Sequence, residues 1–390
     1  MGRDLRRAAP AGRRPGLTPS AGPTRHPRLR VGVDATPLLG QRTGIGRFVH
    51  HLVEGLAQMP DIELAATAFT LRGWRSLAAA LPPGVRRRGI PVPARALRKA
   101  WGSSSFPPVE LLAGRMDVFH ATNYVLPPLR RAAGVLSVHD LSFLHLPATV
   151  HPDSLVYREL VPQGLRRAAA VCALTAVTAD EIAQTYGFPR ERIVVTPLGV
   201  DQTWFTAAGP DDDLEARLSL PSEYLLFVGT REPRKGLSTL AAAHRQLRAI
   251  DADVPPLVLV GGSGWGGELP SQPGIITVPY LDQADLPSVV AGAVALVMPS
   301  VYEGFGLPIL EAMACGTPVV ISDSPAMVEV AGGRAAVFPV GDAESLADRI
   351  SEVLTGRHPE AGDLRAYAAG WTWSACVAAA LAAYRMAAQQ

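Results

Sequence analysis

Short apolar runs alternate with helical patterns over most of the chain, and this alternation constrains the fold more than any other feature. The first run, LRVGVDATPL at 29–38, is followed by the turn QRTGIGR and a helical pattern from Phe48 to Met59. Similar apolar runs recur at 62–70, 116–120, 134–138, 171–175 and 192–199. Apolar strands separated by helices are typical of a parallel sheet with helices on both faces.

A second series of the same kind begins after a polar, acidic and proline-containing segment. Its expected strands are LLFVG (225–229), LVLVGG (257–262), IITVPY (275–280), VALVMPS (294–300) and TPVVIS (317–322), with a helix from Leu237 to Ile250. The sequence therefore predicts an α/β protein with two Rossmann-like, doubly wound domains. The carboxyl ends of both sheets would face a shared cleft, which is where ligands of such folds bind.

A chain of 390 residues is long for a single core and accommodates two domains of ordinary size. We expect a disordered basic tail at 1–28, an N-terminal domain at 29–205, a linker region at 206–222, a C-terminal domain at 223–368 and a final segment at 369–390. That final segment contains the alanine-rich pattern SACVAAALAAYRMAA, which favours a helix. We expect this helix to pack back on the N-terminal domain.

Charge and cysteine content exclude several classes of protein. Residues 1–30 hold eight arginines and one aspartate, so the rest of the chain is net negative although the whole chain carries +2. A mildly acidic body argues against nucleic-acid binding. The three cysteines form neither a metal-binding spacing nor a disulfide framework, which suits a reducing cytoplasm. The tail lacks the apolar core of a secretory signal peptide, and no run approaches the length of a membrane-spanning helix.

The segment VMPSVYEGFGLPILEAMACGTPVV, at 297–320, carries the strongest functional signal. Gly304 and Gly306 follow a buried strand and let a ligand approach the backbone. Pro308 suits the first position of a helix, and Gly316 suits the end of that helix. The helix would point unpaired amide groups and the positive end of its dipole at the cleft, which suits a phosphate or a developing anion.

Two glutamates flank this turn, and each has a structural and a functional interpretation. Glu311 is expected in the first helical turn, where a carboxylate gains about 0.3–1 kcal/mol from the helix dipole. Glu303, in the loop before the helix, is either solvated or bound to a polyhydroxylated ligand, because a carboxylate accepts hydrogen bonds from sugar hydroxyls. Together the two acids could hold the two ends of a nucleotide-sugar.

A basic turn follows the first strand of the second series. The segment VGTREPRKGL holds Arg231, Arg234 and Lys235, whose guanidinium forks and ammonium charge match phosphate oxygens. A solvated basic turn is the common alternative. The position at the carboxyl end of a strand favours a ligand.

The pattern EGFGLPILE, followed by AMACGTPVV, resembles the signature of family 4 retaining glycosyltransferases with the GT-B fold. The resemblance covers residues 30 to 385. It includes, in the order found in mannosyltransferase-like members, RTGIGRFV, FHATN, SVHDLSF, PLGVD, VGTREPRKGL and PSVYEGFGLPILEAMACGTPVV. The last of these motifs is the most specific.

The resemblance implies a role for each matching polar residue. Glu311 would bind the ribose hydroxyls of the donor, and Glu303 would face the hydroxyls of the transferred sugar. Lys235 would contact the diphosphate. His139, in SVHD, would lie beside the sugar near the reacting carbon, although by itself this position suits a loop cap equally well.

The resemblance also assigns roles to backbone groups. Gly44 and Gly46, in the first loop of the N-terminal domain, would approach the phosphate and the acceptor. Backbone amides would surround the sugar and the phosphate at Gly304, Phe305, Gly306 and Leu307. Tyr280 ends a strand near the expected nucleobase. The sequence does not decide whether its ring stacks on the base or packs in the core.

One position departs from the family pattern. Many relatives have an arginine five residues before the residue matching Lys235, whereas this chain has Thr230 there. Either Arg231 or Arg234 would then hold phosphate, and the sequence leaves this choice open.

Two other motif matches are set aside. GSGWGG at 262–267 fits G-x-G-x-x-G after a strand, but ELPSQPG follows with two prolines, so no helix opens as a dinucleotide site requires. Asp251 and Asp253 form a D-x-D pattern, yet they precede a Pro-Pro pair rather than ending a strand at the cleft. We therefore expect a surface loop at 262–267 and no required metal.

The sequence thus predicts a hexosyltransferase that acts with retention, with GDP-mannose favoured by resemblance. The donor would be a nucleoside-diphosphate sugar, and no cofactor is expected. The acceptor stays open among a lipid-linked glycan, a polysaccharide and a small molecule. The enzyme would be cytoplasmic. Weak peripheral contact with the inner face of the membrane, through the tail or the patch RALRKAWG (95–102), stays open beside solvated segments.

Three alternatives compete with this prediction. An epimerase or a phosphorylase would keep the GT-B fold but change the chemistry. A catalytically inactive protein would bind the nucleotide-sugar as a scaffold, although intact Glu303, Glu311, Lys235 and His139 count against decay. An NAD-type oxidoreductase is weakened by the failed glycine fingerprint.

Overall fold

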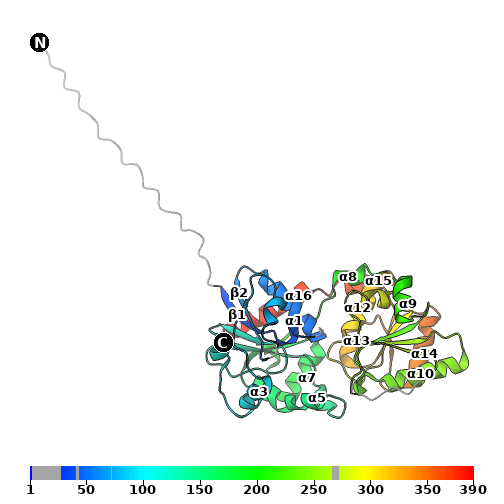
Figure 1. The fold of residues 1–390 in the computed structure, drawn as a ribbon, viewed down its shortest axis with the longest axis horizontal. Helices are drawn as coiled ribbons and strands as arrows, with labels where there is room; N and C mark the ends of the chain where they lie inside the picture. Colours follow the sequence, from blue (N-terminus) through cyan, green and yellow to red (C-terminus); the bar gives the residue numbers. More distant parts are fainter. Residues whose placement is uncertain (2–27, 41–43, 72, 266–271) are drawn as a thin grey trace.

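The computed structural model describes Met1 and residues 28–40, 44–71, 73–265 and 272–390. Most of the tail predicted at 1–28 lies outside these described residues. Within them the chain forms two α/β halves that lie side by side, one built on a seven-stranded sheet and the other on a six-stranded sheet (Figure 1). The predicted α/β fold with two Rossmann-like domains is therefore confirmed.

The first sheet is parallel and has the order β3-β2-β1-β4-β5-β6-β7. Its strands are β1 Leu29–Asp34, β2 Ile62–Thr67, β3 Arg86–Arg87, β4 Val118–Ala121, β5 Ala133–Val138, β6 Ala168–Ala173 and β7 Ile193–Val195. Neighbouring residues point to opposite faces, so Val118 and Phe119 of β4 lie in separate apolar clusters. Both faces are covered, which explains why these strands are apolar throughout.

The second sheet is also parallel and has the order β10-β9-β8-β11-β12-β13. Its strands are β8 Leu225–Val228, β9 Leu257–Val260, β10 Ile275–Val278, β11 Ala295–Met298, β12 Val319–Ser322 and β13 Ala336–Phe338. In each sheet the strand order reverses once, between β1 and β4 and between β8 and β11. Crevices at the carboxyl ends of such strands bind ligands, so the loops after them position the site.

Helices cover both sheets. Those of the first half are α1 Gly44–Ala57, α2 Leu77–Ala80, α3 Ala94–Ser103, α4 Val109–Ala113, α5 Ser142–His145, α6 Tyr157–Leu165 and α7 Ala176–Tyr186. Those that follow are α8 Gln202–Phe205, α9 Asp212–Leu218, α10 Leu237–Ile250, α11 Leu286–Ala291, α12 Leu307–Cys315, α13 Pro325–Ala331, α14 Ala343–Leu354, α15 Ala361–Ala368 and α16 Trp373–Ala388.

One local prediction is wrong. Helix α1 begins at Gly44 rather than at Phe48, so Gly44 and Gly46 belong to its first turn and not to a loop. Glycine has a poor helix propensity, but burial of Phe48 and Leu52 against the core overrides it. The segment expected as a linker, 206–222, contains helix α9.

The chain crosses between the halves twice, first near Val200 and again near Trp371, and these two crossovers lie together. The amide of Val200 donates to the carbonyl of Trp371 at 3.0 Å. After the first crossover α8 packs against α12, and after the second α16 packs against α1 and β6. The chain therefore ends on the first half, as the red helix in Figure 1 shows.

One 28-residue helical segment, Ala361–Ala388, is long and apolar enough to span a membrane by length and composition alone. This corrects the expectation that no run approaches that length. In the fold the segment is two helices, α15 and α16, separated at 369–372. Buried residues of α16, among them Val377 and Leu381, pack in an apolar core cluster that contains residues of both halves, so packing within the protein accounts for their apolar character.

The contact between the crossovers generates a stability prediction. A Cβ atom added at Gly199 would lie 2.2 Å from the backbone nitrogen of Trp373 and 2.5 Å from the carbonyl carbon of Thr372. We expect Gly199→Ala to lower the free energy of unfolding by about 1–3 kcal/mol, because backbone atoms must shift to relieve the overlap. Urea denaturation measures this change.

The matched control is Gly362→Ala in α15, where an added Cβ meets no atom within 4 Å. That variant should be as stable as the wild type or slightly more stable, since alanine favours a helix. Equal stability of both variants would contradict the packing described for the crossovers.

Candidate active site

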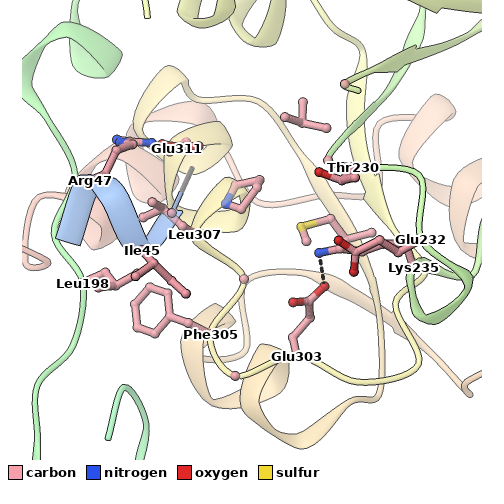
Figure 2. A pocket seen from close by; sticks show the side chains of 18 of the residues that line it. Ile45, Arg47, Leu198, Thr230, Glu232, Lys235, Glu303, Phe305, Leu307 and Glu311 are labelled. Atoms are coloured by element: carbon pink, nitrogen blue, oxygen red, sulfur yellow. Dashed lines mark hydrogen bonds and ion pairs between the residues drawn. The ribbon is translucent and has the colours of Figure 1, made fainter. Parts of the chain in front are cut away.

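A cavity of about 580 Å³ lies where the carboxyl ends of the two sheets meet. Its walls come from the start of α1, from the segments that follow most strands of both sheets, and from the start of α12 (Figure 2). The volume is typical of a site for a ligand of small-molecule size. The reversal of strand order in each sheet explains this position.

The two halves touch at Gly304. A Cβ atom there would lie 1.9 Å from the carbonyl oxygen of His139, which belongs to the loop after β5 in the other half. The hydroxyl of Thr175 also donates to the Gly304 carbonyl at 3.4 Å. The sequence predicted that this glycine admits a ligand. Gly304 does line the cavity, and in the structure its missing side chain also leaves room for the backbone of the opposite domain.

Gly306 then starts helix α12. Its φ of 87° lies in the left-handed region, which glycine adopts without strain. The helix runs from Leu307 to Cys315 and ends at Gly316, whose φ of 80° gives the predicted left-handed cap. The amino end of α12 lines the cavity through Leu307 and Pro308.

Glu303 is buried between two cations. Its Oε1 accepts a hydrogen bond from Nζ of Lys235 at 2.5 Å, and its Oε2 accepts one from Nη1 of Arg234 at 3.0 Å. Burial acts to raise the pKa of Glu303, but Lys235 and Arg234 outweigh it and lower that pKa to about 2. Glu303 is therefore an anion at neutral pH. Its hydrogen bond to Lys235 is drawn in Figure 2.

Arg234 is held rigidly at the cavity wall. Its Nε donates to Glu232 at 2.9 Å and its Nη1 to the carbonyl of Tyr302 at 3.1 Å. Burial acts to lower its pKa, but the carboxylates of Glu303 and Asp140 raise it, so the guanidinium stays charged. Arg231 does not line the cavity, so geometry favours Arg234 of the two arginines that the sequence left open.

Glu311 lies deeper in the cleft, against a residue of the other half. It is the fifth residue of α12, so the expectation that it lies in the first turn is wrong. Its Oε1 accepts a hydrogen bond from Nη1 of Arg47 in α1, and Nη2 of Arg47 donates to Asp201 at 3.0 Å. The side chains of Arg47 and Glu311 are only 10% and 5% exposed.

His139 is buried at the cavity wall as a neutral imidazole. Its Nε2 lies 2.8 Å from the carbonyl oxygen of Thr122, which can only accept, so Nε2 carries the proton. Burial lowers the pKa of His139. The rings of Phe48 and Tyr124 pack edge-on against it at 5.7 and 5.4 Å. Nδ1 is thereby left as a hydrogen-bond acceptor.

The remaining predicted residues divide into two groups. The cavity is lined by Gly44, Phe305, Leu307 and Tyr280, whereas Gly46 and Arg231 do not line it. Tyr280 is 40% exposed, which argues against packing in the core.

Of the two motif matches that were set aside, Asp251 and Asp253 do not line the cavity, whereas the GSGWGG loop lines it through Gly262 and Ser263. Residues 262–265 have no regular secondary structure, and the rest of GSGWGG lies outside the described residues. Asp251 and Asp253 are exposed, and Asp251 accepts the amide of Asp253 at 2.9 Å. Within the described ranges, no three His, Cys, Asp or Glu side chains gather as a metal site requires.

Sequence reasoning missed Arg47, Tyr124 and Glu232. Arg47 was visible only as one letter of RTGIGRFV, and nothing in the sequence indicates that it reaches the second half. Tyr124 lines the cavity with a φ of 60°, which is uncommon for a residue other than glycine and often marks a functional site. That strained backbone has no sequence signal.

Two Rossmann-like domains that enclose a ligand-sized cavity between their sheet ends define a protein of the GT-B class. Comparisons with known proteins agree. Residues 222–356 match the family model described as "Glycosyl transferases group 1", and residues 43–199 match the "Glycosyl transferase 4-like domain".

Among curated proteins, the chain is 28% identical over 386 residues to O-antigen chain mannosyltransferase B of Escherichia coli, covering 90% of this chain and 98% of that protein. It is 33% identical over 300 residues to the D-inositol 3-phosphate glycosyltransferase of Actinosynnema mirum, covering 71% and 70% of the two. Among solved structures, Anabaena HepE in complex with UDP-glucose superposes with a TM-score of 0.67 at 18% identity, covering 90% of this chain and 98% of that one. The chain therefore belongs to the family 4, group 1 glycosyltransferases, and it is a glycosyltransferase.

The buried ion cluster generates a prediction about stability. Glu303→Gln leaves Arg234 and Lys235 buried without their shared anion, so we expect the free energy of unfolding to fall by about 3–5 kcal/mol. In the wild type this contribution is present above the pKa of an unfolded glutamate and is lost only as the pH falls through about 2. Urea denaturation at neutral pH measures the difference.

Glu352→Gln is the control, because Glu352 pairs with Arg349 on the surface, where the two side chains are 29% and 41% exposed. Its loss should change the free energy of unfolding by less than about 1 kcal/mol. A Glu303→Gln variant that is no less stable than this control would show that the buried cluster contributes nothing.

Proposed function

We propose that this enzyme transfers a hexose, with mannose favoured, from a nucleoside-diphosphate sugar to an acceptor hydroxyl with retention of configuration. The product would be a glycan or a polysaccharide. The observation that carries the proposal is the cluster of Glu303, Arg234 and Lys235 beside the amino end of α12, in a cavity enclosed by both domains.

The cluster suits both ends of a sugar–phosphate bond. Lys235 and Arg234 supply positive charge for phosphate oxygens, and the amino end of α12 adds amide donors. Glu303 neutralises both cations in the absence of ligand. An arriving diphosphate competes for Lys235, while sugar hydroxyls donate to the carboxylate oxygen that Lys235 releases. Donor binding thus exchanges one set of charge-assisted hydrogen bonds for another.

The chemical step breaks the bond between the anomeric carbon and the leaving phosphate oxygen. Negative charge grows on that oxygen, and the fixed cations and amides stabilise it without reorganisation. Glu303 is ion-paired with two cations, which makes it a poor covalent nucleophile. This supports direct attack by the acceptor hydroxyl on the face of the leaving group, as the family resemblance implies, with the departing phosphate taking the acceptor proton.

His139 would act by hydrogen bonding rather than by proton transfer. Its Nε2 proton is committed to Thr122, and burial keeps the ring neutral. Nδ1 can then accept a hydrogen bond from a hydroxyl of the transferred sugar. This role orients the sugar so that its anomeric carbon faces the acceptor.

Relatives support the classes of donor and acceptor. The Escherichia coli relative is named a mannosyltransferase of the O-antigen chain, which supports mannose and a glycan acceptor. HepE was solved with UDP-glucose, which supports a nucleoside-diphosphate sugar as donor and makes uridine an alternative to guanosine as the base. We propose a cytoplasmic location, where such donors are available, and a reaction that requires no metal or cofactor.

The site assignment predicts a loss of activity. We expect Glu303→Gln and Lys235→Met each to lower the rate of sugar transfer by about 10²–10³-fold. Lys235→Met removes a cation that stabilises the charge growing on the leaving phosphate, and Glu303→Gln removes the anion that holds the sugar hydroxyls. Arg231→Gln is the control and should keep a rate near that of the wild type, since Arg231 does not line the cavity. Transfer and donor hydrolysis are both measured. Rates near wild type in the first two variants would overturn the assignment.

A thermal-shift panel of GDP-, UDP-, ADP- and TDP-sugars identifies the donor, since a ligand of the folded state raises the melting temperature. NMR of the anomeric proton in the product then tests retention. An epimerase would convert the donor with no acceptor present, and a phosphorylase would require inorganic phosphate. A scaffold protein would bind the donor without turnover. Each of these outcomes would replace the proposed reaction.

A further inference from the structure

Arg47 crosses from the first half to the nucleotide side of the cleft. It is the fourth residue of α1, and its guanidinium bonds Glu311 of α12 in the second half. In Figure 2 it extends from the blue helix to Glu311 on the yellow one. Its other terminal nitrogen bonds Asp201, and the ring of Trp204 lies 5.9 Å away. The guanidinium is therefore buried and fixed at both ends.

No other described cation contacts Glu311. The elements packed around α12 carry few charged side chains, namely Asp363 and Arg365 of α15 and Glu329 of α13, and Asp363 is exposed to solvent. Arg365 of α15 donates to the carbonyl of Cys315 at 2.7 Å, and Glu329 of α13 accepts the amides of Ala176 and Val177. Lys235, across the cavity, bonds Glu303. The charge state of Glu311 thus depends mainly on Arg47 and on the nearby Asp201.

Arg47 and Asp201 act on Glu311 in opposite directions. Burial raises the pKa of Glu311, Arg47 opposes that rise, and the negative charge of Asp201 adds to it. A carboxylate accepts hydrogen bonds on both oxygens, whereas a protonated carboxyl presents a donor on one of them. The vicinal hydroxyls of a ribose need two acceptors. Only the anionic form of Glu311 satisfies both.

We propose that Arg47 is a positioning residue for the donor, which reaches across the cleft to keep Glu311 an anion turned toward the ribose. Recognition of the nucleotide by the second domain then depends on a side chain of the first. This inference rests on the proposed function, because it assigns the ribose of a nucleoside-diphosphate sugar to Glu311.

The same contact couples donor binding to the arrangement of the domains. Asp201, at the first crossover, also accepts a hydrogen bond from Nε1 of Trp373 at 2.9 Å. Trp373 is the first residue of α16, after the second crossover. His51 of α1 contacts Asp201 at 3.0 Å. Arg47 therefore meets Glu311 only while α1 and both crossovers hold their places. A donor bound at Glu311 would stabilise this arrangement by reciprocal coupling.

The test measures how strongly the protein prefers ribose over deoxyribose. Dissociation constants of UDP and GDP, and of their 2′,3′-dideoxy analogues, are measured by calorimetry from about pH 5 to pH 9, the range in which shifted carboxyls and histidine titrate. The ratio of the two constants reports the hydrogen bonds to Glu311. In the wild type this preference should be present at high pH and lost as the pH falls through the pKa of Glu311.

Two variants should move the pH at which the preference for ribose is lost, in opposite directions. Arg47→Gln removes the cation, so the preference should be lost at a higher pH than in the wild type. At neutral pH the preference should fall about tenfold, which corresponds to about 1.4 kcal/mol. Asp201→Asn removes the opposing anion, so the preference for ribose should be lost at a lower pH than in the wild type. Arg47→Lys keeps the charge and should restore most of the preference. Glu352→Gln, which changes a surface carboxylate that does not line the cavity, is the control and should leave the profile unmoved.

Several results would overturn the inference. Arg47→Gln would weaken both analogues equally if Arg47 had only a structural role, and it would strengthen ribose binding at every pH if Arg47 competed with the donor. A shift in the same direction for Asp201→Asn and Arg47→Gln, or any shift for Glu352→Gln, would also contradict it. If Arg47→Gln does not fold, the inference is still tested by comparing the pH profile of the ribose preference in Asp201→Asn with that of the wild type.

The wild-type measurement separates this inference from the proposed function. If the wild type binds none of the nucleoside diphosphates UDP, GDP, ADP and TDP, the proposed function and this inference fail together. If the wild type binds one of them and prefers ribose, but the variants leave that preference unchanged, only the role of Arg47 is overturned.

Discussion

The site depends on one close approach between the two domains. The loop after β11 meets the loop after β5 at Gly304, where no side chain fits between the backbones. Because the carboxyl ends of both sheets converge there, short loops from many strands reach one cavity. Glu303 and His139, which lie next to this contact on opposite domains, are thereby brought to the same wall of the cavity.

Buried charge is the second organising feature. Two carboxylates of the second domain are held by cations, Glu303 by Lys235 and Arg234 from its own domain and Glu311 by Arg47 from the other. Such groups are expensive to bury alone and become acceptable when paired and hydrogen-bonded. Replacing buried ion pairs with well-packed apolar residues is often neutral or stabilising, so stability alone does not explain these pairs. Their retention at the cavity wall agrees with a function in binding an anionic, hydroxyl-rich ligand.

The sequence predicted the fold closely because local and global signals agree. The bounds of α10 match the pattern from Leu237 to Ile250, and the apolar runs locate most strands, although most of these runs extended too far into the loop after the strand. The strands β3 and β13 were missed because they are short, and the sequence of β3 is Arg86–Arg87. The start of α1 was misplaced because packing against the core overrides the weak helix propensity of its glycines.

The site was predictable as a set of motifs but not as a set of contacts. The residues of the motif EGFGLPILE lie together because they are local in sequence. The bond between Arg47 and Glu311 joins residues 264 positions apart, and no spacing rule indicates it. The contact between Gly304 and the backbone of His139 was equally unpredictable, since a glycine indicates a close approach but does not identify the group that approaches.

The central claim is that a sugar diphosphate displaces the bond between Lys235 and Glu303, so that the phosphate takes the lysine and the sugar takes the carboxylate. A crystal structure with the intact donor and no acceptor tests this most directly. The account predicts the diphosphate on Lys235 and Arg234 and the sugar hydroxyls on Glu303. A donor bound with the bond between Lys235 and Glu303 intact, or outside the cavity, would contradict it.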